Sequence, residues 1–176
     1  MYIALPSGRH VRSDLVNAHR HCHYCGSQYP QVESFPRTCP ACGRQVWSNP
    51  LPVAVVAVRA EGGVLIIKRG IEPAKGKWAL PGGFLETGET WQEGSCREVF
   101  EETGLRIDPA GIELVEALSV AQNSQIILFS VTRSSYRLSD FAFESSEEAL
   151  DLRVMREPEE LAFAGHTTFA RKFLYL

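Results

Sequence analysis

Apolar residues along the chain group into short runs whose lengths are typical of β-strands. Pro52–Ala60 and Val64–Arg69 are rich in β-branched residues, and the Gly-Gly pair between them is typical of a hairpin turn. Trp78–Gly83 predicts a short strand that ends in a second Gly-Gly turn. The first part of the domain is therefore expected to be a hairpin followed by one further strand.

The second half of the chain shows the same kind of pattern. Glu113–Ala121 and Gln125–Arg133 predict a second hairpin across Gln122-Asn123-Ser124, and Glu148–Met155 predicts another strand. Hairpins stand where an all-parallel sheet would need helical crossovers.

Two segments have the features of helices. Thr90–Thr103 reads as a helix that stops at Gly104, where a glycine commonly adopts the left-handed conformation of a C-cap. Thr167–Tyr175 is expected to form a C-terminal helix. Strands and helices thus interleave, and the predicted fold class is α+β with a mixed sheet.

The chain divides into three parts by composition. Residues 1–18 show no periodicity and are expected to be a flexible N-terminal segment. Residues 19–48 contain two pairs of cysteines, and the Pro-rich junction Asn49–Pro52 separates them from a domain over residues 52–176.

Charge is distributed unevenly over these parts. The net charge is −3, but residues 1–50 carry five basic and two acidic residues, whereas residues 51–176 carry thirteen and nineteen. The acidic larger part argues against broad nucleic-acid binding, which needs a basic face, and suits a site that gathers divalent cations. No apolar run is long enough to span a membrane, and Met1–Leu15 lacks the order of a signal peptide, so we expect a cytoplasmic protein.

The four paired cysteines form two Cys-x2-Cys-Gly units, Cys22 with Cys25 and Cys39 with Cys42. Two intervening residues let a tight turn direct both thiolates at one ion, and four thiolates complete a tetrahedral structural Zn²⁺ site. The neighbouring His19, His21 and His23 could each replace a cysteine, but four cysteines suffice, and we interpret the histidines as surface residues. The lone Cys96 is interpreted as a small, buried apolar residue.

Three glutamates lie on one face of the helix predicted over Thr90–Thr103. Glu98, Glu101 and Glu102 stand at positions i, i+3 and i+4, so their carboxylates converge. Such a cluster is either a solvated acidic face or a site for cations, and carboxylate oxygens are ligands that Mg²⁺ prefers.

The segment around these glutamates decides between the two. It resembles the Nudix box, G-x5-E-x7-R-E-U-x-E-E-x-G-U with U apolar. All specified positions are met, by Gly83, Glu89, Arg97, Glu98, Val99, Glu101, Glu102, Gly104 and Leu105. Leu80-Pro81-Gly82-Gly83 and Glu86 also look like family features, whereas Gly94-Ser95 departs from the small helix formers usual there.

The resemblance implies a Nudix α/β/α sandwich over residues 52–176 and a role for each matching residue. Glu98, Glu101 and Glu102, with the backbone carbonyl of Gly82, would hold Mg²⁺ or Mn²⁺. Arg97 would orient the glutamates through charge-assisted hydrogen bonds. Glu89 would pair with Arg97 or support the shell around the metal.

The family reaction is attack of water on phosphorus in a diphosphate bridge, and a base must accept the proton of that water. In relatives that act on ADP-ribose-like substrates this base can lie downstream of the box. Glu147, Glu148 and Asp151 form the acidic cluster at a suitable distance along the chain. Glu148 is the candidate, and an exposed strand start is the alternative interpretation.

A zinc ribbon before a Nudix domain is similar to the arrangement in NADH pyrophosphatases and in a group resembling FAD or ADP-ribose pyrophosphatases. The NADH group carries Ser-Gln-Pro-Trp-Pro-Phe-Pro after the box, whereas Ser119–Gln125 contains neither proline nor tryptophan. The run Arg69–Trp78 is more similar to the second group. The resemblance thus implies release of AMP from ADP-ribose or FAD, with NADH as the alternative substrate. Trp78 and Phe84 could stack on a base or pack in the core.

A non-catalytic module is the rival hypothesis, in which the fold senses a nucleotide and the ribbon contacts protein or nucleic acid. A pure sensor has no need of all three metal-binding glutamates, and none of them is missing. Nudix proteins are often dimers, so a homodimer is a further expectation, which the residue pattern neither supports nor opposes.

Overall fold

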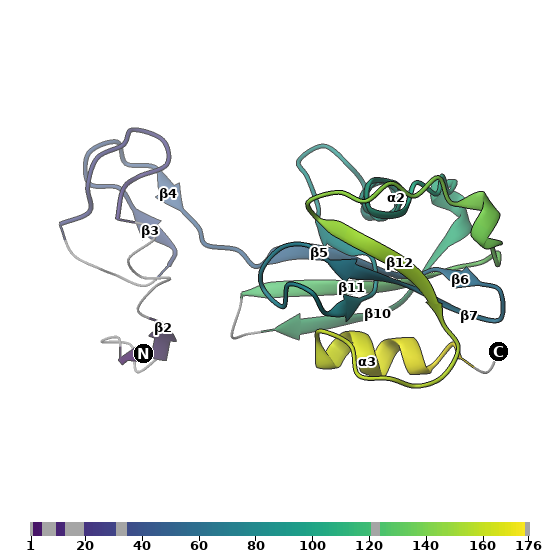
Figure 1. The fold of residues 1–176 in the computed structure, drawn as a ribbon. Coiled ribbons are helices and arrows are strands. Elements are labelled where there is room, and N and C mark those ends of the chain that lie inside the picture. Colours follow the sequence, from purple (N-terminus) through teal and green to yellow (C-terminus); the bar gives the residue numbers. More distant parts are fainter. Residues whose placement is uncertain (1, 5–9, 13–19, 31–34, 121–123, 175–176) are drawn as a thin grey trace. The chain divides into compact units, whose positions relative to one another are not determined.

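The chain folds into two compact units, Met1–Asn49 and Pro50–Leu176 (Figure 1). The computed structural model describes residues 2–4, 10–12, 20–30, 35–120 and 124–174. No helix within these ranges is both long and apolar enough to cross a membrane.

The first unit contains short antiparallel strand pairs and two tight turns. β1 (Tyr2–Ala4) pairs with β2 (His10–Arg12), a pairing that the sequence pattern did not indicate. β3 (Arg37–Thr38) pairs with β4 (Gln45–Val46). The hydrophobic cluster of the first unit is small and contains Cys22, Cys39 and Val46, with Tyr29 and Phe35 packed against them.

The second unit contains two sheets. One has the order β10-β11-β5-β9 and is mixed, because β11 and β5 run parallel; the other has the order β12-β7-β6, with β8 paired to β7. The first sheet comprises β5 (Leu51–Ala57), β9 (Gly82–Phe84), β10 (Ile112–Val120) and β11 (Gln125–Thr132). The second comprises β6 (Arg59–Ala60), β7 (Gly63–Arg69), β8 (Trp78–Ala79) and β12 (Ala149–Met155).

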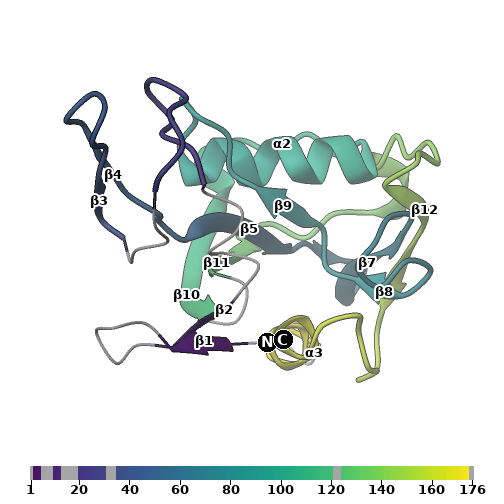
Figure 2. The ribbon, with the colours of Figure 1, turned by 90° about the vertical axis from the view of Figure 1, so that its left-hand side faces the viewer.

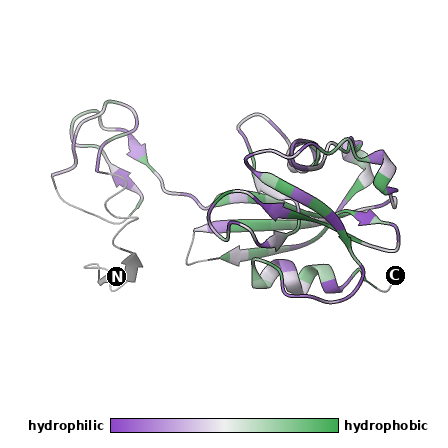
Figure 3. Ribbon diagram, viewed as in Figure 1, coloured by the Kyte–Doolittle hydropathy of each residue, from purple (hydrophilic) through white to green (hydrophobic). Residues whose placement is uncertain are grey.

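Alternation along the central strands explains why two helices are needed to cover the sheets. In β5, Val55 and Ala57 belong to one hydrophobic cluster, whereas Val56 belongs to a second one. Successive side chains on a strand point to opposite faces, so a continuous apolar run must be covered on both faces. The central strands are correspondingly hydrophobic in Figure 3.

Helices α2 (Trp91–Thr103) and α3 (Ala164–Arg171) lie on opposite faces of the sheets (Figure 2). Val99 of α2 packs into the cluster that contains Val56, and Phe169 of α3 packs into the cluster that contains Val55. Short 3-10 turns at Pro109–Gly111 and Leu138–Asp140 complete the unit. The predicted α+β fold class and α/β/α sandwich are confirmed.

The first predicted hairpin is more divided than expected. β5 and β6 are separate strands in different sheets, and only β6 pairs with β7, through Arg59↔Val64 and Ala60↔Gly63. The turn between β6 and β7 has positive φ at Glu61 (46°) and Gly62 (76°), as a tight two-residue hairpin turn requires. The predicted second hairpin is confirmed as the antiparallel pair β10–β11, although residues 121–123 of its turn lie outside the described residues.

The prediction of one strand over Trp78–Gly83 is wrong. The segment is two strands, because the chain leaves β7 after Ala79 and joins β5 at Gly82. The second Gly-Gly pair is not a turn but lies within β9. A Cβ on Gly82 would lie 2.1 Å from the Ala54 oxygen, so the glycine permits the backbone to approach β5 closely.

The C-terminal helix begins and ends earlier than predicted. α3 starts at Ala164, because the Thr167 hydroxyl accepts a hydrogen bond from the Leu161 amide and draws the preceding turn against the helix. It ends at Arg171 rather than Tyr175, and residue 175 lies outside the described residues.

Candidate active site and metal sites

Helix α2 carries the predicted glutamates and is defined at both ends by specific caps. The Thr90 side chain accepts from the Glu93 amide (3.3 Å), and the Glu93 carboxylate accepts from the Thr90 amide (2.7 Å). At the other end Gly104 is left-handed (φ 72°) and its amide donates to the Phe100 carbonyl. These caps satisfy backbone groups that a helix end otherwise leaves unpaired.

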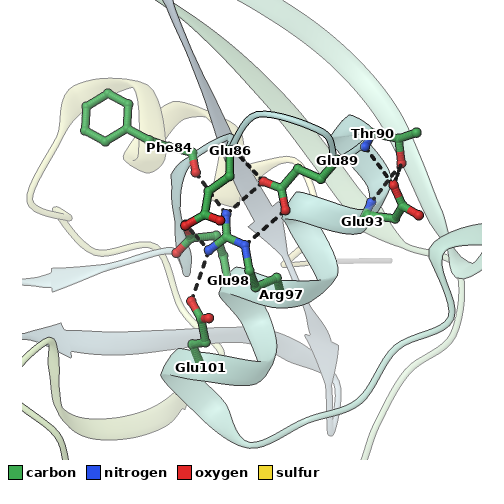
Figure 4. A network of polar contacts seen from close by, with 8 residues as sticks. All are labelled: Phe84, Glu86, Glu89, Thr90, Glu93, Arg97, Glu98 and Glu101. Atoms are coloured by element: carbon green, nitrogen blue, oxygen red, sulfur yellow. Dashed lines mark hydrogen bonds and ion pairs between the residues drawn. The ribbon is translucent and has the colours of Figure 1, made fainter.

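Arg97 is the centre of the polar network on this helix (Figure 4). Its guanidinium donates two hydrogen bonds to the Glu89 carboxylate, at 2.9 and 3.0 Å, in the bidentate geometry common for arginine–carboxylate pairs. It also donates to Glu98 (2.9 Å) and to Glu101 (3.0 Å). One guanidinium thereby sets the positions of three carboxylates.

Two backbone groups that the sequence pattern did not reveal complete this network. The Phe84 carbonyl accepts from Arg97 (3.0 Å), and the Glu86 amide donates to Glu89 (2.7 Å). Hydrogen bonding from Arg97 lowers the pKa of Glu89 below its ordinary value. The loop before α2 is therefore tied to the charged face of the helix by its main chain.

Gly94, the departure from the usual box residues, has a local structural reason. A Cβ at this position would lie 2.4 Å from the Leu85 side chain and 2.6 Å from the Glu89 carboxylate. The glycine makes room for Glu89 to lie against the helix beside Arg97. The helix propensity lost at Gly94 thus accompanies the placement of a site residue.

Glu98 and Glu102 are buried, whereas Glu101 is exposed. Burial raises the pKa of Glu98 above its ordinary value and raises the pKa of Glu102 to about 8. The like charge of Glu98 adds to the effect of burial and further raises the pKa of Glu102. Buried carboxylates facing one another favour a cation among them, and their oxygens suit a hard divalent ion.

Residues of β9 lie directly against these carboxylates. The Gly82 amide donates to Glu102 (2.8 Å). A Cβ on Gly83 would lie 2.5 Å from the Glu98 carboxylate, so a larger residue there would displace that carboxylate from its present position. The structure therefore places Gly82 beside Glu102 and Gly83 beside Glu98, while the part of the Gly82 carbonyl as a metal ligand stays a prediction.

Glu148 lies just before β12 and is exposed. Its amide donates to the Ser146 hydroxyl (3.2 Å), and its carbonyl accepts from the Gly70 amide (2.7 Å). Its charge contributes to the raised pKa of both Glu98 and Glu102, after the larger effect of burial. Of the acidic cluster, Asp151 is engaged by the Leu152 amide (2.8 Å).

The two aromatic candidates for stacking differ in their surroundings. Trp78 packs against the core cluster, and the Arg153 guanidinium lies 4.4 Å from its ring centre. Phe84 is 52% exposed and lies on β9 beside the Arg97 network. Core packing therefore explains Trp78, while Phe84 is the aromatic ring open to a ligand.

The four paired cysteines of the first unit converge on one point. Cys22 and Cys42 Sγ are 3.7 Å apart, as are Cys25 and Cys39 Sγ, and all four sulfurs lie within 4.8 Å of one another. A tetrahedron with Zn–S bonds of about 2.3 Å has sulfurs about 3.8 Å apart. The donor set and spacing thus fit a structural zinc ion.

The two cysteine turns are built alike. Gly26 and Gly43 have φ of 72° and 71°, and their amides donate to the carbonyls of Cys22 and Cys39. His21 and His23 are exposed, as interpreted, and His19 lies outside the described residues. Cys96 is half-buried rather than fully buried, and its burial raises the thiol pKa to about 11.

Comparison with known proteins assigns the family. The model of the NUDIX domain matches residues 49–176, which is more than half of the chain. The chain belongs to the Nudix family. The complete box and the α/β/α sandwich agree with this assignment.

Similar proteins include enzymes and proteins known by structure. The chain is 30% identical over 105 residues to a protein named NAD-capped RNA hydrolase NudC from Shigella dysenteriae; this covers 58% of the chain but 40% of that protein. A Nudix hydrolase from Nitrosomonas europaea, known by crystal structure, is 29% identical with a TM-score of 0.70, covering 88% of this chain and 90% of that one. The Nudix domain of Shewanella oneidensis NrtR, solved with ADP ribose, shares the fold at 19% identity and a TM-score of 0.52, over 61% of this chain and 73% of that one.

Proposed function

We propose that the unit Pro50–Leu176 is a Mg²⁺-dependent hydrolase that cleaves the diphosphate bond of a nucleoside diphosphate linked to another moiety. ADP-ribose or FAD is the proposed substrate, and AMP is a product. The observation that carries the proposal is the buried pair Glu98 and Glu102 beside exposed Glu101. Arg97 donates hydrogen bonds to Glu98 and Glu101. A solvated acidic face would leave these carboxylates in water.

Each residue of the network has a distinct part in the proposed reaction. Glu98, Glu101 and Glu102, with the Gly82 carbonyl, would hold Mg²⁺ or Mn²⁺. The ion, when bound, supplies neutralisation of phosphate charge and a more acidic water. Arg97 keeps the carboxylates in place, because its donors fix Glu98 and Glu101 while Glu89 fixes Arg97.

Glu148 is the proposed general base. It is exposed, so it can accept a proton and pass it to solvent, and its charge acts on Glu98 and Glu102. Its backbone is held by Gly70 and Ser146, which would keep the carboxylate near the reacting water.

The choice of ADP-ribose or FAD as the proposed substrate rests on two features of the sequence. Ser119–Gln125 lacks the proline and tryptophan of the NADH-type motif, and Arg69–Trp78 is similar to the FAD/ADP-ribose group. Phe84 offers its exposed ring for stacking on a nucleotide base.

The four cysteines would hold a structural zinc ion that takes no part in the reaction, because four thiolates leave no open position.

The test is AMP release from ADP-ribose, FAD, NADH and NAD-capped RNA, measured with and without Mg²⁺. Glu101→Gln and Glu102→Gln should each lower turnover by about 10²–10³-fold, as loss of an electrostatic stabiliser does. Glu113→Gln, on the exposed edge strand β10, is the matched control and should leave turnover unchanged. Equal rates for Glu102→Gln and the native protein would reject the assigned site.

NADH or NAD-capped RNA is the second candidate substrate. The similarity to NAD-capped RNA hydrolases supports it, although the match spans only part of their length. A kcat/KM for NADH above that for ADP-ribose and FAD would replace the first substrate assignment while keeping the reaction. A salt titration of binding to single-stranded RNA tests nucleic-acid contact, because phosphate contacts weaken as salt rises.

A further inference from the structure

His166 is a buried titratable residue that the proposed reaction does not use. It lies on α3, on the opposite side of the sheets from α2, and it is 8% exposed. Its ring lies edge-on to Phe129 (5.9 Å between centres) and tilted against Phe163 (5.0 Å). A polar ring in such apolar surroundings needs a hydrogen-bond partner.

The partner of His166 is the backbone of the segment that crosses between the two sheets. Nδ1 accepts from the Leu80 amide (3.2 Å). The acceptor must therefore be unprotonated, which places the proton of the neutral ring on Nε2. Burial lowers the pKa of His166 to about 4, so the ring remains this acceptor at neutral pH.

The crossing segment, Leu80-Pro81-Gly82, ends in the candidate metal site. Leu80 donates to His166, Pro81 has no amide hydrogen, and its carbonyl accepts from the Val56 amide (2.9 Å). Gly82 then donates to the buried carboxylate of Glu102 (2.8 Å). The two amides of the segment are thus held by α3 on one side and α2 on the other.

The tight fit at Gly82 makes this segment stiff. Its φ of 151° and its contact with Ala54 leave no room for a side chain, so the peptide has little freedom to shift. Displacement of Leu80 would move Gly82 and, with it, the hydrogen bond that orients Glu102. Partners that orient metal ligands in this way commonly affect metal affinity.

We propose that His166 is a positioning residue for the divalent-metal site, which acts by holding the Leu80 amide so that Gly82 keeps Glu102 in its metal-binding orientation. This inference rests on the proposed function, because it takes Glu102 as a metal ligand. It adds a residue from outside the Nudix box to the site, and it connects α3 to chemistry on α2.

The experiment compares three variants of the full chain with the native protein. His166→Leu removes the acceptor at similar volume. His166→Asn retains an acceptor near the position of Nδ1 and should restore what His166→Leu loses. Phe169→Leu, buried on the same helix without a hydrogen-bonding role, is the control for lost packing.

Mn²⁺ alone, titrated without substrate and followed by its electron paramagnetic resonance signal, is the first readout. His166→Leu should raise the Mn²⁺ dissociation constant by about 10-fold or more, in the range for partners that orient metal ligands. His166→Asn and Phe169→Leu should both stay within about 2–3-fold of the native value, well below that range. An equal rise for Phe169→Leu would show that general destabilisation, not the hydrogen bond, is responsible.

Hydrogen exchange in the metal-free protein is the second readout. Exchange of the Gly82 amide should accelerate in His166→Leu but not in His166→Asn, while the Leu65 amide, bonded to Val58 in the core, serves as the internal reference. Native Mn²⁺ affinity and native Gly82 exchange in His166→Leu would overturn the proposal. If Glu102→Gln binds Mn²⁺ as the native protein does, the proposed function fails instead, and the Gly82 exchange result still decides what His166 holds.

Discussion

The two units of the chain hold their folds by different means. The buried hydrophobic cluster of the first unit contains Cys22, Cys39 and Val46, two of which are also candidate metal ligands. The second unit has two larger clusters, and strands β5 and β7 contribute to both. Small units bury too little apolar surface for stability by packing alone, so we expect the first unit, unlike the second, to depend on a bound metal.

The same contrast applies to the two candidate metal sites. The four sulfurs lie within 4.8 Å of one another, and four thiolates around one ion would leave no position for a substrate. In the second unit the glutamates lie along one side of a helix, with Glu101 exposed, so bound ions would remain open to phosphate. A closed site stabilises a fold, whereas an open one can support a reaction.

Removal of zinc should produce the largest effect and should confine it to the first unit. Structural zinc contributes about 10–16 kcal/mol of apparent binding energy to small zinc domains, so a chelator or Cys39→Ser should unfold this unit. Two-dimensional NMR should then show loss of dispersed signals from residues 20–49 and retention of those from the second unit. Cys96→Ser, at a thiol outside the cluster, should keep both the zinc and the signals. Dispersed signals of the first unit after complete chelation would contradict the proposed role of the metal.

A substitution at Arg97 should have the opposite outcome, because it should impair the second unit and leave the zinc of the first unit in place. Arg97→Lys keeps the charge but loses the two-pronged bond to Glu89, so turnover should fall by about 10–100-fold through misplaced carboxylates. Steady-state kinetics with zinc analysis should show lost activity at full zinc content. Arg133→Lys, in an exposed pair with Glu113, should change neither. Native turnover in Arg97→Lys would mean that the network does not position the metal-binding groups.

How much of this contrast the sequence predicts depends on the distance between interacting residues. The two candidate metal sites depend on local spacing: pairs of cysteines with two residues between them in tight turns, and glutamates one helical turn apart with Gly104 as the helix stop. Such periodicity is visible in a single sequence, and so are the alternating strands that produce the sandwich. The family resemblance supplied the identity of the box residues.

Non-local contacts were not predictable in this way. Nothing in the sequence indicates that Trp78–Phe84 divides between two sheets. The hydrogen bond from Arg97 to the Phe84 carbonyl and the one from the Leu80 amide to His166 have no sequence signal either. His166 and Leu80 are 86 positions apart, and a lone histidine has no spacing signature. Gly94 was interpreted only as a loss of helix propensity, because its contact with Glu89 requires the folded loop.

Acid should destabilise the second unit through His166. The folded-state pKa of about 4 is below the ordinary value of 6.5, because burial and, next, the charge of Arg69 disfavour the protonated ring. The unfolded chain therefore binds more protons between these values, so stability present above pH 6.5 is lost as the pH falls toward 4. Between pH 6.5 and 5 this residue should lower the free energy of unfolding by about 1.5 kcal/mol.

Denaturant unfolding of native protein and His166→Asn at both pH values, followed by NMR signals of the second unit, checks this. The difference between the two proteins isolates His166 from other titrating groups. The loss of free energy of unfolding between the two pH values should be smaller by about 1.5 kcal/mol in His166→Asn. Parallel pH profiles would show that His166 is not held neutral by burial.

The smallest expected effect is at the start of α2, where a capping interaction, rather than a metal or a buried core, contributes to stability. Thr90→Ala removes the acceptor for the Glu93 amide, and loss of such a cap lowers the free energy of unfolding by about 1 kcal/mol. Thr87→Ala, an exposed threonine in the preceding loop, is the matched control. Because the cap lies within the second unit, urea unfolding should show the shift in its signals alone, with zinc content unchanged. A shift of similar size in the first unit would mean that the two units do not unfold independently, and the contrast between metal-held and packing-held folds would then need revision.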